Sequence, residues 1–210
     1  MSKLQEVAAL VENGKAKKIA AAVQEALNEG TGATELLNAM IDAMGVVGEN
    51  FKNGEIFVPE MLVAAKAMKK GVDVLKPYLT SGEVGGAGKY IMGTVAGDLH
   101  DIGKNLVIMM LESAGFEVID LGVDVRPEKF VEACRENPET KIVGLSALLT
   151  TTMPAMKETV ALLNEQDFRK NIKIMVGGAP ITQAFAEEIG ADVYTPDAAS
   201  CAQKAKELVS

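Results

Sequence analysis

The 210 residues of the chain have a mass of 22.2 kDa and an apolar fraction of 48%, enough for one large buried core or two small ones. The net charge of −8 argues against nucleic acid and anionic membranes as partners, because both attract basic surfaces. The chain opens directly into an amphipathic helix pattern and has no run of about 18 apolar residues, which predicts a cytoplasmic protein without a membrane span. Cys134 and Cys201 lie far apart, so neither a disulfide framework nor a cysteine-rich metal site is indicated.

Residues 2–77 carry apolar side chains at helical spacing and show no strand pattern. Glycine-containing breaks divide this run at residues 13–14, 28–32 and 52–54. They predict about four helices with the short connections of a bundle, the last beginning around Pro59, since proline is tolerated in a first turn. We therefore expect a four-helix domain at residues 1–80, followed by a flexible Gly-rich linker at residues 81–88.

Residues 89–210 alternate short β-rich runs with helical segments of ten or more residues. The β-rich runs are 89–95, 117–121, 141–146, 172–176 and 192–194. Five such units predict an α/β domain with a flavodoxin-like, doubly wound parallel sheet of five strands in the order 2-1-3-4-5. Sheets of this kind bind ligands at the carboxyl ends of their strands, where the strand order reverses. The loops after the first and third strands are expected to face each other at that point.

The only histidine of the chain, His100, follows the first predicted strand, and Ser146 ends the third. A dinucleotide site is excluded because Gly97 and Gly103, six residues apart, do not make the G-x-G-x-x-G pattern. A receiver domain would need an aspartate in place of Ser146, and a zinc site would need three or four suitable ligands. What remains is a metal already bound in the plane of a tetrapyrrole or corrin, which needs a single axial nitrogen from the protein.

Asp98 lies two residues before His100. Its carboxylate is close enough to accept one imidazole N–H while the other ring nitrogen faces a ligand, an arrangement that fixes the tautomer of a metal-binding histidine. Gly103, at the start of the following helix, would let a bulky group approach the backbone closely. These features favour an axial-ligand site after the first strand.

Each of these features also has a plainer interpretation. The histidine can be a solvated loop residue beside a helix cap at Asp101. Ser146 and the hydroxyls of residues 150–152 can satisfy backbone amides at a strand end and a helix start. Residues 177–178 can form a tight turn before a helix that begins at Pro180.

Three short patterns together resemble the signature of cobalamin-binding domains that hold the cofactor base-off, with a histidine below the cobalt. They are D-x-H-x-x-G at residues 98–103, S-x-L at residues 146–148 and the glycine pair at residues 177–178. The wider segments GTVAGDLHDIGKNLV, GLSALLTTTM and IFVPEMLVAAKAMKKG are similar to the corrinoid proteins of methylamine, methanol and related methyltransferase systems, and to the cobalamin module of methionine synthase. The resemblance covers nearly the whole chain and implies a helical cap before a cobalamin-binding Rossmann-like domain.

The resemblance implies a role for each matching residue. His100 would be the lower axial ligand of cobalt, Asp98 its hydrogen-bond partner, and Thr152 the hydroxyl that continues this relay where methionine synthase has a serine. The other residues implied to contact the cofactor or its nucleotide tail are Asp101, Ile102, Gly103, Ser146, Leu148, Thr150, Gly177 and Gly178.

In this family the helical domain caps the cofactor. This arrangement would place Phe57, Met61 and Met68 near the upper face of the cofactor. For the two methionines, the plain alternative is burial in the core of the bundle. The implied function is that of a non-catalytic methyl carrier. Cobalt(I) of cobalamin or a related corrinoid would take a methyl group from a substrate:corrinoid methyltransferase. The resulting methylcobalamin form would pass it to a second methyltransferase that acts on a thiol or a folate, and a reductive activase is the third implied partner.

Two other functions share this cofactor signature. The small subunit of a radical mutase would not need the helical cap and would carry adenosylcobalamin. A cobalamin-dependent regulator would need a basic face for DNA, whereas residues 1–88 carry 9 Lys+Arg against 11 Asp+Glu. For the methyl carrier, the sequence leaves methylamines, quaternary amines, methanol and aryl methyl ethers open as methyl donors.

Overall fold

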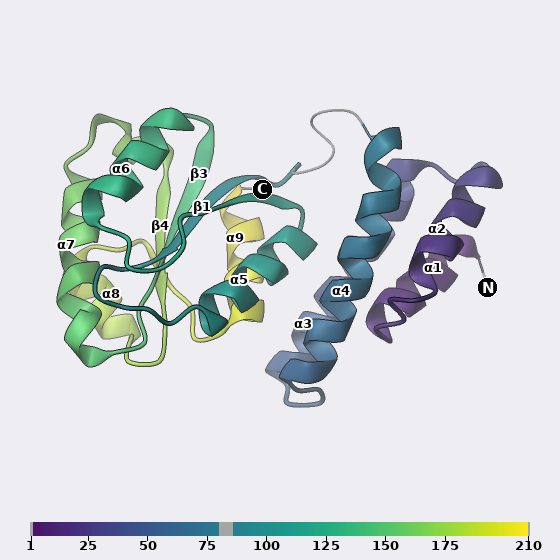
Figure 1. Ribbon diagram of the computed structural model, residues 1–210, viewed down its shortest axis with the longest axis horizontal. Helices are drawn as coiled ribbons and strands as arrows, with labels where there is room; N and C mark the ends of the chain where they lie inside the picture. Colours follow the sequence, from purple (N-terminus) through teal and green to yellow (C-terminus); the bar gives the residue numbers. More distant parts are fainter. Residues whose placement is uncertain (1, 80–85, 210) are drawn as a thin grey trace. The chain divides into compact units, whose positions relative to one another are not determined.

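The computed structural model describes residues 2–79 and 86–209, and the chain forms two compact units whose main boundary lies between Gly86 and Ala87 (Figure 1). The first unit is helical in its described residues, and the second is an α/β domain. Residues 81–85 of the expected linker lie outside the described residues. None of the helices in the described ranges is long and apolar enough to cross a membrane.

Four α-helices make up the described part of the helical unit. They are α1 (Lys3–Glu12), α2 (Ile19–Asn28), α3 (Ala33–Lys52) and α4 (Val58–Leu75), with a 3₁₀ turn at Lys76–Tyr78 after the last. Helix α1 starts with a capping box, in which Ser2 Oγ accepts a hydrogen bond from the Gln5 N–H (3.3 Å) and Gln5 Oε1 accepts one from the Ser2 N–H (3.0 Å). Helix α4 has Pro59 in its first turn, as expected.

Helix α4 has a buried apolar face and an exposed one. Met61, Ala65 and Met68 recur at helical spacing and are 1%, 2% and 1% exposed. Phe57, the residue before the first turn, is 67% exposed, and Leu62 is 38% exposed. The sequence of α4 therefore supplies apolar surface beyond what the buried core uses.

The α/β unit is built on one parallel sheet in the order β2-β1-β3-β4-β5, which confirms the predicted fold class. Its strands are β1 (Gly88–Thr94), β2 (Phe116–Asp120), β3 (Thr140–Ser146), β4 (Lys173–Gly177) and β5 (Val193–Tyr194). Its helices are α5 (Ile102–Ser113), α6 (Pro127–Glu136), α7 (Met153–Asn164), α8 (Gln183–Ile189) and α9 (Ala198–Val209), with 3₁₀ turns at Thr150–Thr152 and Asp167–Asn171.

The sheet is covered on both faces, with α6, α7 and α8 on one side and α5 and α9 on the other (Figure 1). Residues 142–145 of β3 are consecutively buried, as a strand between two helical layers must be. On the first side, Phe130 of α6 and Met156 of α7 belong to the buried cluster. On the second, the Tyr90 hydroxyl of β1 lies 3.7 Å from Cys201 Sγ of α9.

The strand register places the loops after β1, β3 and β4 at one edge. Thr94 is the partner of Ser146, and Ser146 is the partner of Gly177, so the three strands end side by side. The glycine-turn alternative expected a helix that begins at Pro180, but helix α8 begins at Gln183. The reason is a turn closed by the Ile181 N–H, which donates to the Gly178 carbonyl (3.0 Å), ahead of the helix cap.

Candidate functional site

The carboxyl edge of the sheet brings together the loop after β1 (residues 95–101, called here the His loop) and the loop after β3 (residues 147–149). Thr94 Oγ1 donates a hydrogen bond to the His100 carbonyl (3.0 Å) and holds the end of the His loop. Two side chains of this loop that contact each other, Asp98 and His100, differ in exposure. The side chain of Asp98 is fully buried, whereas that of His100 is 52% exposed.

Asp98 links the two loops through both of its carboxylate oxygens. Oδ1 accepts a hydrogen bond from the His100 backbone N–H (3.1 Å) and lies 2.9 Å from His100 Nδ1. Oδ2 accepts from the Leu148 N–H (2.7 Å) and the Thr152 hydroxyl (2.9 Å), and the Leu149 N–H lies at 3.4 Å. The structure thus brings Asp98, His100 and Thr152 together, although Thr152 is 54 positions further along the chain than Asp98.

These contacts decide where the hydrogen of the imidazole lies. Burial by itself would raise the pKa of the Asp98 carboxyl. Hydrogen bonds from the Leu148 and His100 backbone N–H groups, and from the His100 and Thr152 side chains, outweigh burial and hold that pKa well below its ordinary value. An ionised carboxylate can only accept hydrogen bonds, so in the neutral ring Nδ1 carries the hydrogen and Nε2 keeps its lone pair. This is the tautomer that binds a metal through Nε2.

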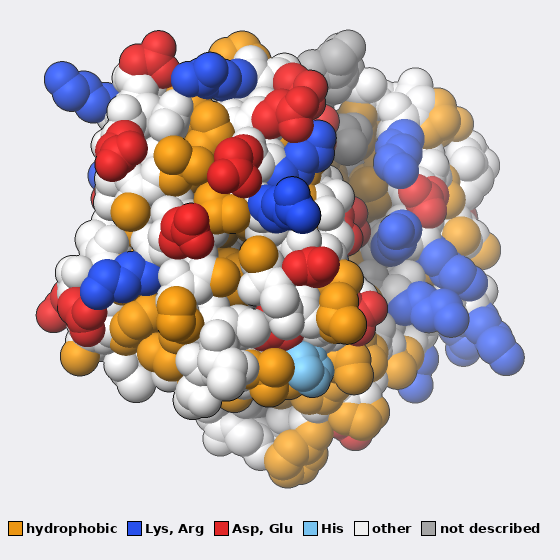
Figure 2. All heavy atoms as spheres, turned by 60° about the vertical axis from the view of Figure 1, so that its left-hand side comes forward, with side chains coloured by type: hydrophobic (Ala, Val, Ile, Leu, Met, Phe, Trp, Pro, Cys, Tyr) orange, Lys and Arg blue, Asp and Glu red, His pale blue; other side chains and the backbone are white. Residues whose placement is uncertain are grey.

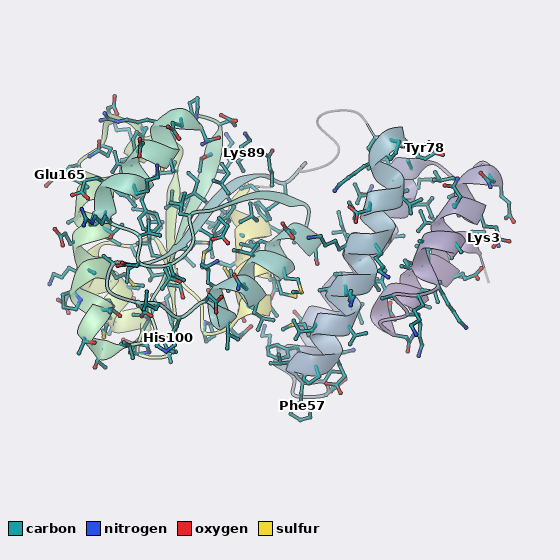
Figure 3. All side chains as sticks on the ribbon, in the orientation of Figure 1. Lys3, Phe57, Tyr78, Lys89, His100 and Glu165 are labelled. Atoms are coloured by element: carbon teal, nitrogen blue, oxygen red, sulfur yellow. The ribbon has the colours of Figure 1, made fainter. Side chains whose placement is uncertain are left out.

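Apolar side chains surround His100 at the surface. Leu99 and Ile102 are 73% and 83% exposed, and Leu148 and Leu149 are 43% and 41% exposed. Figure 2 shows the pale blue imidazole at the surface, and Figure 3 places His100 at the rim of the α/β unit. Exposed groups of large apolar residues of this kind mark sites of binding.

The remaining predicted residues near this edge differ in exposure. Ser146 is half-buried at the end of β3, and Thr150 is exposed. The Thr152 hydroxyl lies 2.9 Å from both the Asp98 carboxylate and the Leu149 carbonyl; its one hydrogen favours the carboxylate, which is the stronger acceptor. Asp101 is exposed, and its carboxylate accepts a hydrogen bond from the Asn105 side chain (3.2 Å).

The three predicted glycines have different surroundings. A Cβ on Gly103 would meet nothing within 4 Å, so the start of α5 is open to a bulky group. A Cβ on Gly177 would lie 3.1 Å from the Thr195 carbonyl oxygen, and one on Gly178, whose φ is +128°, would overlap the Ala147 carbonyl oxygen. Packing within the protein therefore accounts for Gly177 and Gly178, and a role for them beside a nucleotide tail stays a prediction.

The predicted residues of the helical unit fall into two classes. Met61 and Met68 are each 1% exposed, which favours the core interpretation for both methionines. Phe57, labelled in Figure 3, is 67% exposed and is free to contact a ligand. Contact between any of the three and the upper face of a cofactor stays a prediction.

Sequence reasoning missed three charged residues near the carboxyl edge. Lys104, only 2% exposed, donates through Nζ to Asp120 (2.7 and 2.8 Å) and to Asn105 Oδ1 (2.8 Å). Asp124 accepts a hydrogen bond from the Gly97 N–H (2.7 Å). Their position in the sequence was the available signal: Asp120 lies near the end of the second predicted strand and Asp124 follows that strand, so both belong to the same edge.

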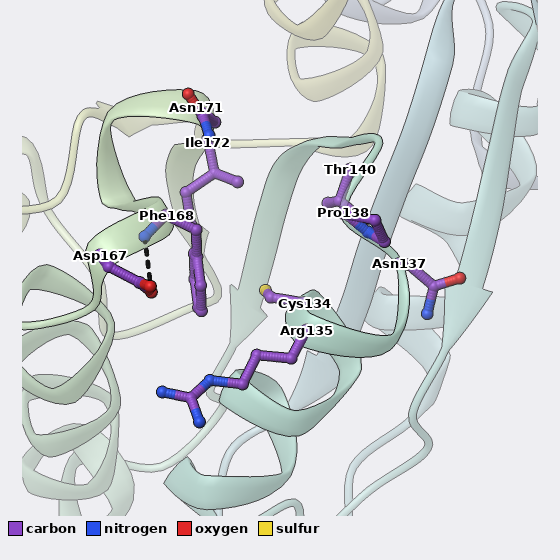
Figure 4. A pocket seen from close by; sticks show the side chains of 9 residues that line it. All are labelled: Cys134, Arg135, Asn137, Pro138, Thr140, Asp167, Phe168, Asn171 and Ile172. Atoms are coloured by element: carbon purple, nitrogen blue, oxygen red, sulfur yellow. Dashed lines mark hydrogen bonds between the residues drawn. The ribbon is translucent and has the colours of Figure 1, made fainter.

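A separate cavity of about 430 Å³ lies at the opposite edge, where β3 begins (Figure 4). Arg135, Thr140 and Phe168 are among its lining residues, and none of the predicted site residues is. Within the described ranges, Thr140 Oγ1 is a buried side-chain atom without a hydrogen-bond partner. This cavity is therefore distinct from the site around His100.

The side chains at the carboxyl edge limit the kind of metal group that can bind there. In the part of the chain that the structure describes, no three His, Cys, Asp or Glu side chains are grouped to hold a metal ion. The edge offers one imidazole nitrogen beside exposed apolar side chains, with open surface at Gly103. This set fits a metal carried in an apolar macrocycle that needs one axial ligand.

Comparisons with known proteins agree with this class of site. Two families, both described as B12 binding domain, match residues 88–202 and 3–76. The chain is 43% identical over 208 residues to dimethylamine corrinoid protein 1 of Methanosarcina acetivorans, covering 99% of this chain and 97% of that protein.

Two solved structures are also similar. A cobalamin-binding protein from Desulfitobacterium hafniense DCB-2 matches with a TM-score of 0.84 and 33% identity, over 99% of this chain and 98% of that one. A chain of the methanol:cobalamin methyltransferase complex from Methanosarcina barkeri matches with a TM-score of 0.84 and 29% identity, over 99% of this chain and 79% of that one.

The fold and the site together define a B12-binding protein whose cofactor is cobalamin or a related corrinoid. More narrowly, the chain belongs to the family of corrinoid proteins of methylamine-type methyltransferase systems.

Proposed function

We propose that the chain carries a methyl group from a methylamine:corrinoid methyltransferase to a second methyltransferase. When bound, the corrin supplies a cobalt centre that can be methylated and demethylated. The observation that carries this proposal is the Asp98–His100 pair, which presents Nε2 at an exposed apolar edge. Similarity to a dimethylamine corrinoid protein over 99% of the chain favours this function over a radical mutase subunit or a regulator.

His100 would hold the cobalt of a bound corrinoid through Nε2 in one state of the cycle and release it in the other. A proton on Nε2 competes with the metal for the same lone pair, so protonation of His100 favours release. Because the pKa of Asp98 is held low, the carboxylate stays ionised and remains an acceptor beside the ring. The 2.9 Å contact orients the neutral ring and would stabilise its protonated form, because the carboxylate is negative.

Two donors from beyond β3 keep Asp98 in place during this change. The Leu148 N–H and the Thr152 hydroxyl both hold Oδ2, at 2.7 and 2.9 Å, and leave Oδ1 to the imidazole and the backbone N–H of His100. These two bonds fix the direction of the carboxylate that faces the imidazole, as the partners of metal-binding histidines usually do. Thr152 would thereby fill the relay role that the family resemblance implies for its hydroxyl.

The rest of the proposed site surrounds the axial ligand. Leu148 provides apolar surface beside the imidazole, and Ser146 and Thr150 line the slot for the displaced nucleotide tail. Open surface at Gly103 supports this, because a bulky group can reach the backbone there. In the helical domain, proposed to span residues 1–80, Phe57 offers an exposed aromatic ring to shield the upper face.

The proposed partners are three enzymes. The names of the similar Methanosarcina proteins favour a methylated amine as the donor for the first methyltransferase. A similar chain forms part of a methanol:cobalamin methyltransferase complex, which supports direct docking on such an enzyme. The second methyltransferase would act on a thiol or a folate, and a reductive activase would restore cobalt(I).

Electron paramagnetic resonance of the cobalt(II) form tests the axial role. The protein is loaded with hydroxocobalamin, reduced to cobalt(II), and measured with natural-abundance and nitrogen-15 histidine. Because the chain has one histidine, we expect hyperfine coupling from a single His100 nitrogen that changes with the isotope and disappears in His100→Ala. Coupling that ignores the isotope would come from the benzimidazole of the cofactor and would contradict the proposal.

A further inference from the structure

Asp124, in the loop after β2, has an unusual backbone conformation. Its φ is +54°, and it is the one non-glycine residue with a positive φ in the described ranges 2–79 and 86–209. Aspartate enters this left-handed region more readily than most residues, but glycine does so at lower cost. An aspartate held in this conformation indicates a task for its side chain.

Asp124 contacts the His loop through two hydrogen bonds. Its Oδ1 accepts from the Gly97 N–H (2.7 Å), and its own N–H donates to the Asp98 carbonyl (3.0 Å). The two bonds lie at the beginning and the end of the Gly97–Asp98 dipeptide. Gly97 has a φ of +79° and no Cβ, so its backbone would be free to adopt other conformations without these contacts.

The loop that carries Asp124 is itself well anchored. The Thr94 N–H donates to the Gly122 carbonyl (3.0 Å), and the Val125 N–H donates to the Thr94 carbonyl (2.9 Å). At the end of β2, the buried Lys104 ammonium lies 2.7 Å from the Asp120 carboxylate. Asp124 therefore contacts the His loop from a loop that is itself held in place by hydrogen bonds to the end of β1.

We propose that Asp124 is a positioning residue for the axial histidine. By fixing the backbone of Gly97 and Asp98, it sets the direction of the Asp98 carboxylate, which in turn keeps the hydrogen of His100 on Nδ1 and the lone pair on Nε2. Asp124 acts through Asp98 and touches neither the imidazole nor the cofactor. The inference rests on the axial role proposed above for His100.

The first measurement uses the protein without corrin. Nitrogen-15 NMR of the single histidine reports its tautomer directly, since no other imidazole contributes. Asp124→Gly tolerates the positive φ but lacks the acceptor, whereas Asp124→Asn keeps an acceptor oxygen at the same place. We expect the Nδ1–H tautomer to dominate in the wild type and in Asp124→Asn, and to lose its dominance in Asp124→Gly.

The second measurement uses the cobalt(II) form of the same proteins. Partners beyond the ligand itself commonly change metal affinity by 10-fold or more, so we expect the ratio of histidine-bound to histidine-free cobalt to fall about 10-fold in Asp124→Gly. Asp124→Asn should restore the ratio of the wild type. If Asp124→Gly does not fold, Asp124→Ser, whose side chain is too short to reach Gly97, replaces it in both measurements.

The outcomes separate this inference from the proposed function. A wild-type tautomer and wild-type histidine ligation in a folded variant without the acceptor would overturn the role of Asp124. So would an equal loss in Asp124→Asn, because the acceptor is present there. Absence of histidine ligation in the wild type would instead refute the axial role of His100, and the tautomer measurement would still decide whether Asp124 positions the ring.

Discussion

Replacing Asp98 by asparagine keeps the shape of the side chain and exchanges one acceptor oxygen for an NH₂ donor. The carboxylate faces donors on both sides, with the His100 N–H at Oδ1 (3.1 Å) and the Leu148 N–H at Oδ2 (2.7 Å). An amide can satisfy only one of these sides. The Leu148 N–H and the Thr152 hydroxyl form the more buried side, so we expect the amide oxygen to remain there and the NH₂ group to face His100.

This arrangement changes the tautomer of the histidine. An NH₂ group opposite Nδ1 requires a lone pair at Nδ1, so the ring hydrogen moves to Nε2 and blocks coordination. The His100 backbone N–H also loses its charged acceptor. A hydrogen bond to a charged group is worth about 1.5–3 kcal/mol, so we expect Asp98→Asn to lower the free energy of unfolding by about that amount. The corresponding fall in Tm is several degrees.

Three measurements check this prediction: urea unfolding of the protein without corrin, nitrogen-15 NMR of His100, and the cobalt(II) spectrum. Asp73→Asn is the matched control, because Asp73 is exposed and forms only a surface ion pair with Lys76 (2.8 Å). We expect that control to change the free energy of unfolding by less than about 1 kcal/mol. If Asp98→Asn kept the Nδ1–H tautomer and histidine ligation, the role assigned to the carboxylate would be wrong.

Three further predictions concern acid stability, redox behaviour and shielding. The pKa of Asp98 in the folded protein lies below its unfolded value of about 4. The carboxylate therefore contributes its full stabilisation above about pH 4, and this contribution is lost as the pH falls further. In urea titrations, acid should destabilise the wild type more steeply than Asp98→Asn. His100→Ala should keep the corrin but make cobalt(II) easier to reduce in a spectral titration, and an unchanged potential would remove His100 from the axial role. Phe57→Ala should speed photolysis of bound methylcobalamin. Because the ring is 67% exposed, this substitution should change the free energy of unfolding by less than about 1 kcal/mol. Equal photolysis rates in the wild type and the variant would show that Phe57 does not shield the cofactor.

Features that depend on neighbouring residues could be predicted from the sequence. The five β-rich runs and the helical spacing before them led to the observed elements, because backbone periodicity is a local property. The parallel order of the sheet followed from the alternation of strands and helices, since such connections are right-handed and short. Asp98 and His100 are two residues apart, so their contact could also be anticipated from chain geometry.

Features that join distant segments were decided by the tertiary structure. The pairing of strand ends brings the Leu148 N–H to Asp98 across 50 positions, and that bond helps to lower the pKa of the carboxyl. The left-handed conformation of Asp124 and its bond to Gly97 likewise exist only because β1 and β2 end side by side.

The same distinction applies to the helical unit. Phe57 and Met61 are one turn apart and both apolar, so helical periodicity alone could not separate their roles. Packing buries Met61 and leaves Phe57 exposed. Hydrophobicity along the chain indicates which residues can be buried, but the surface that is covered depends on which helices meet, and that is a property of the folded structure.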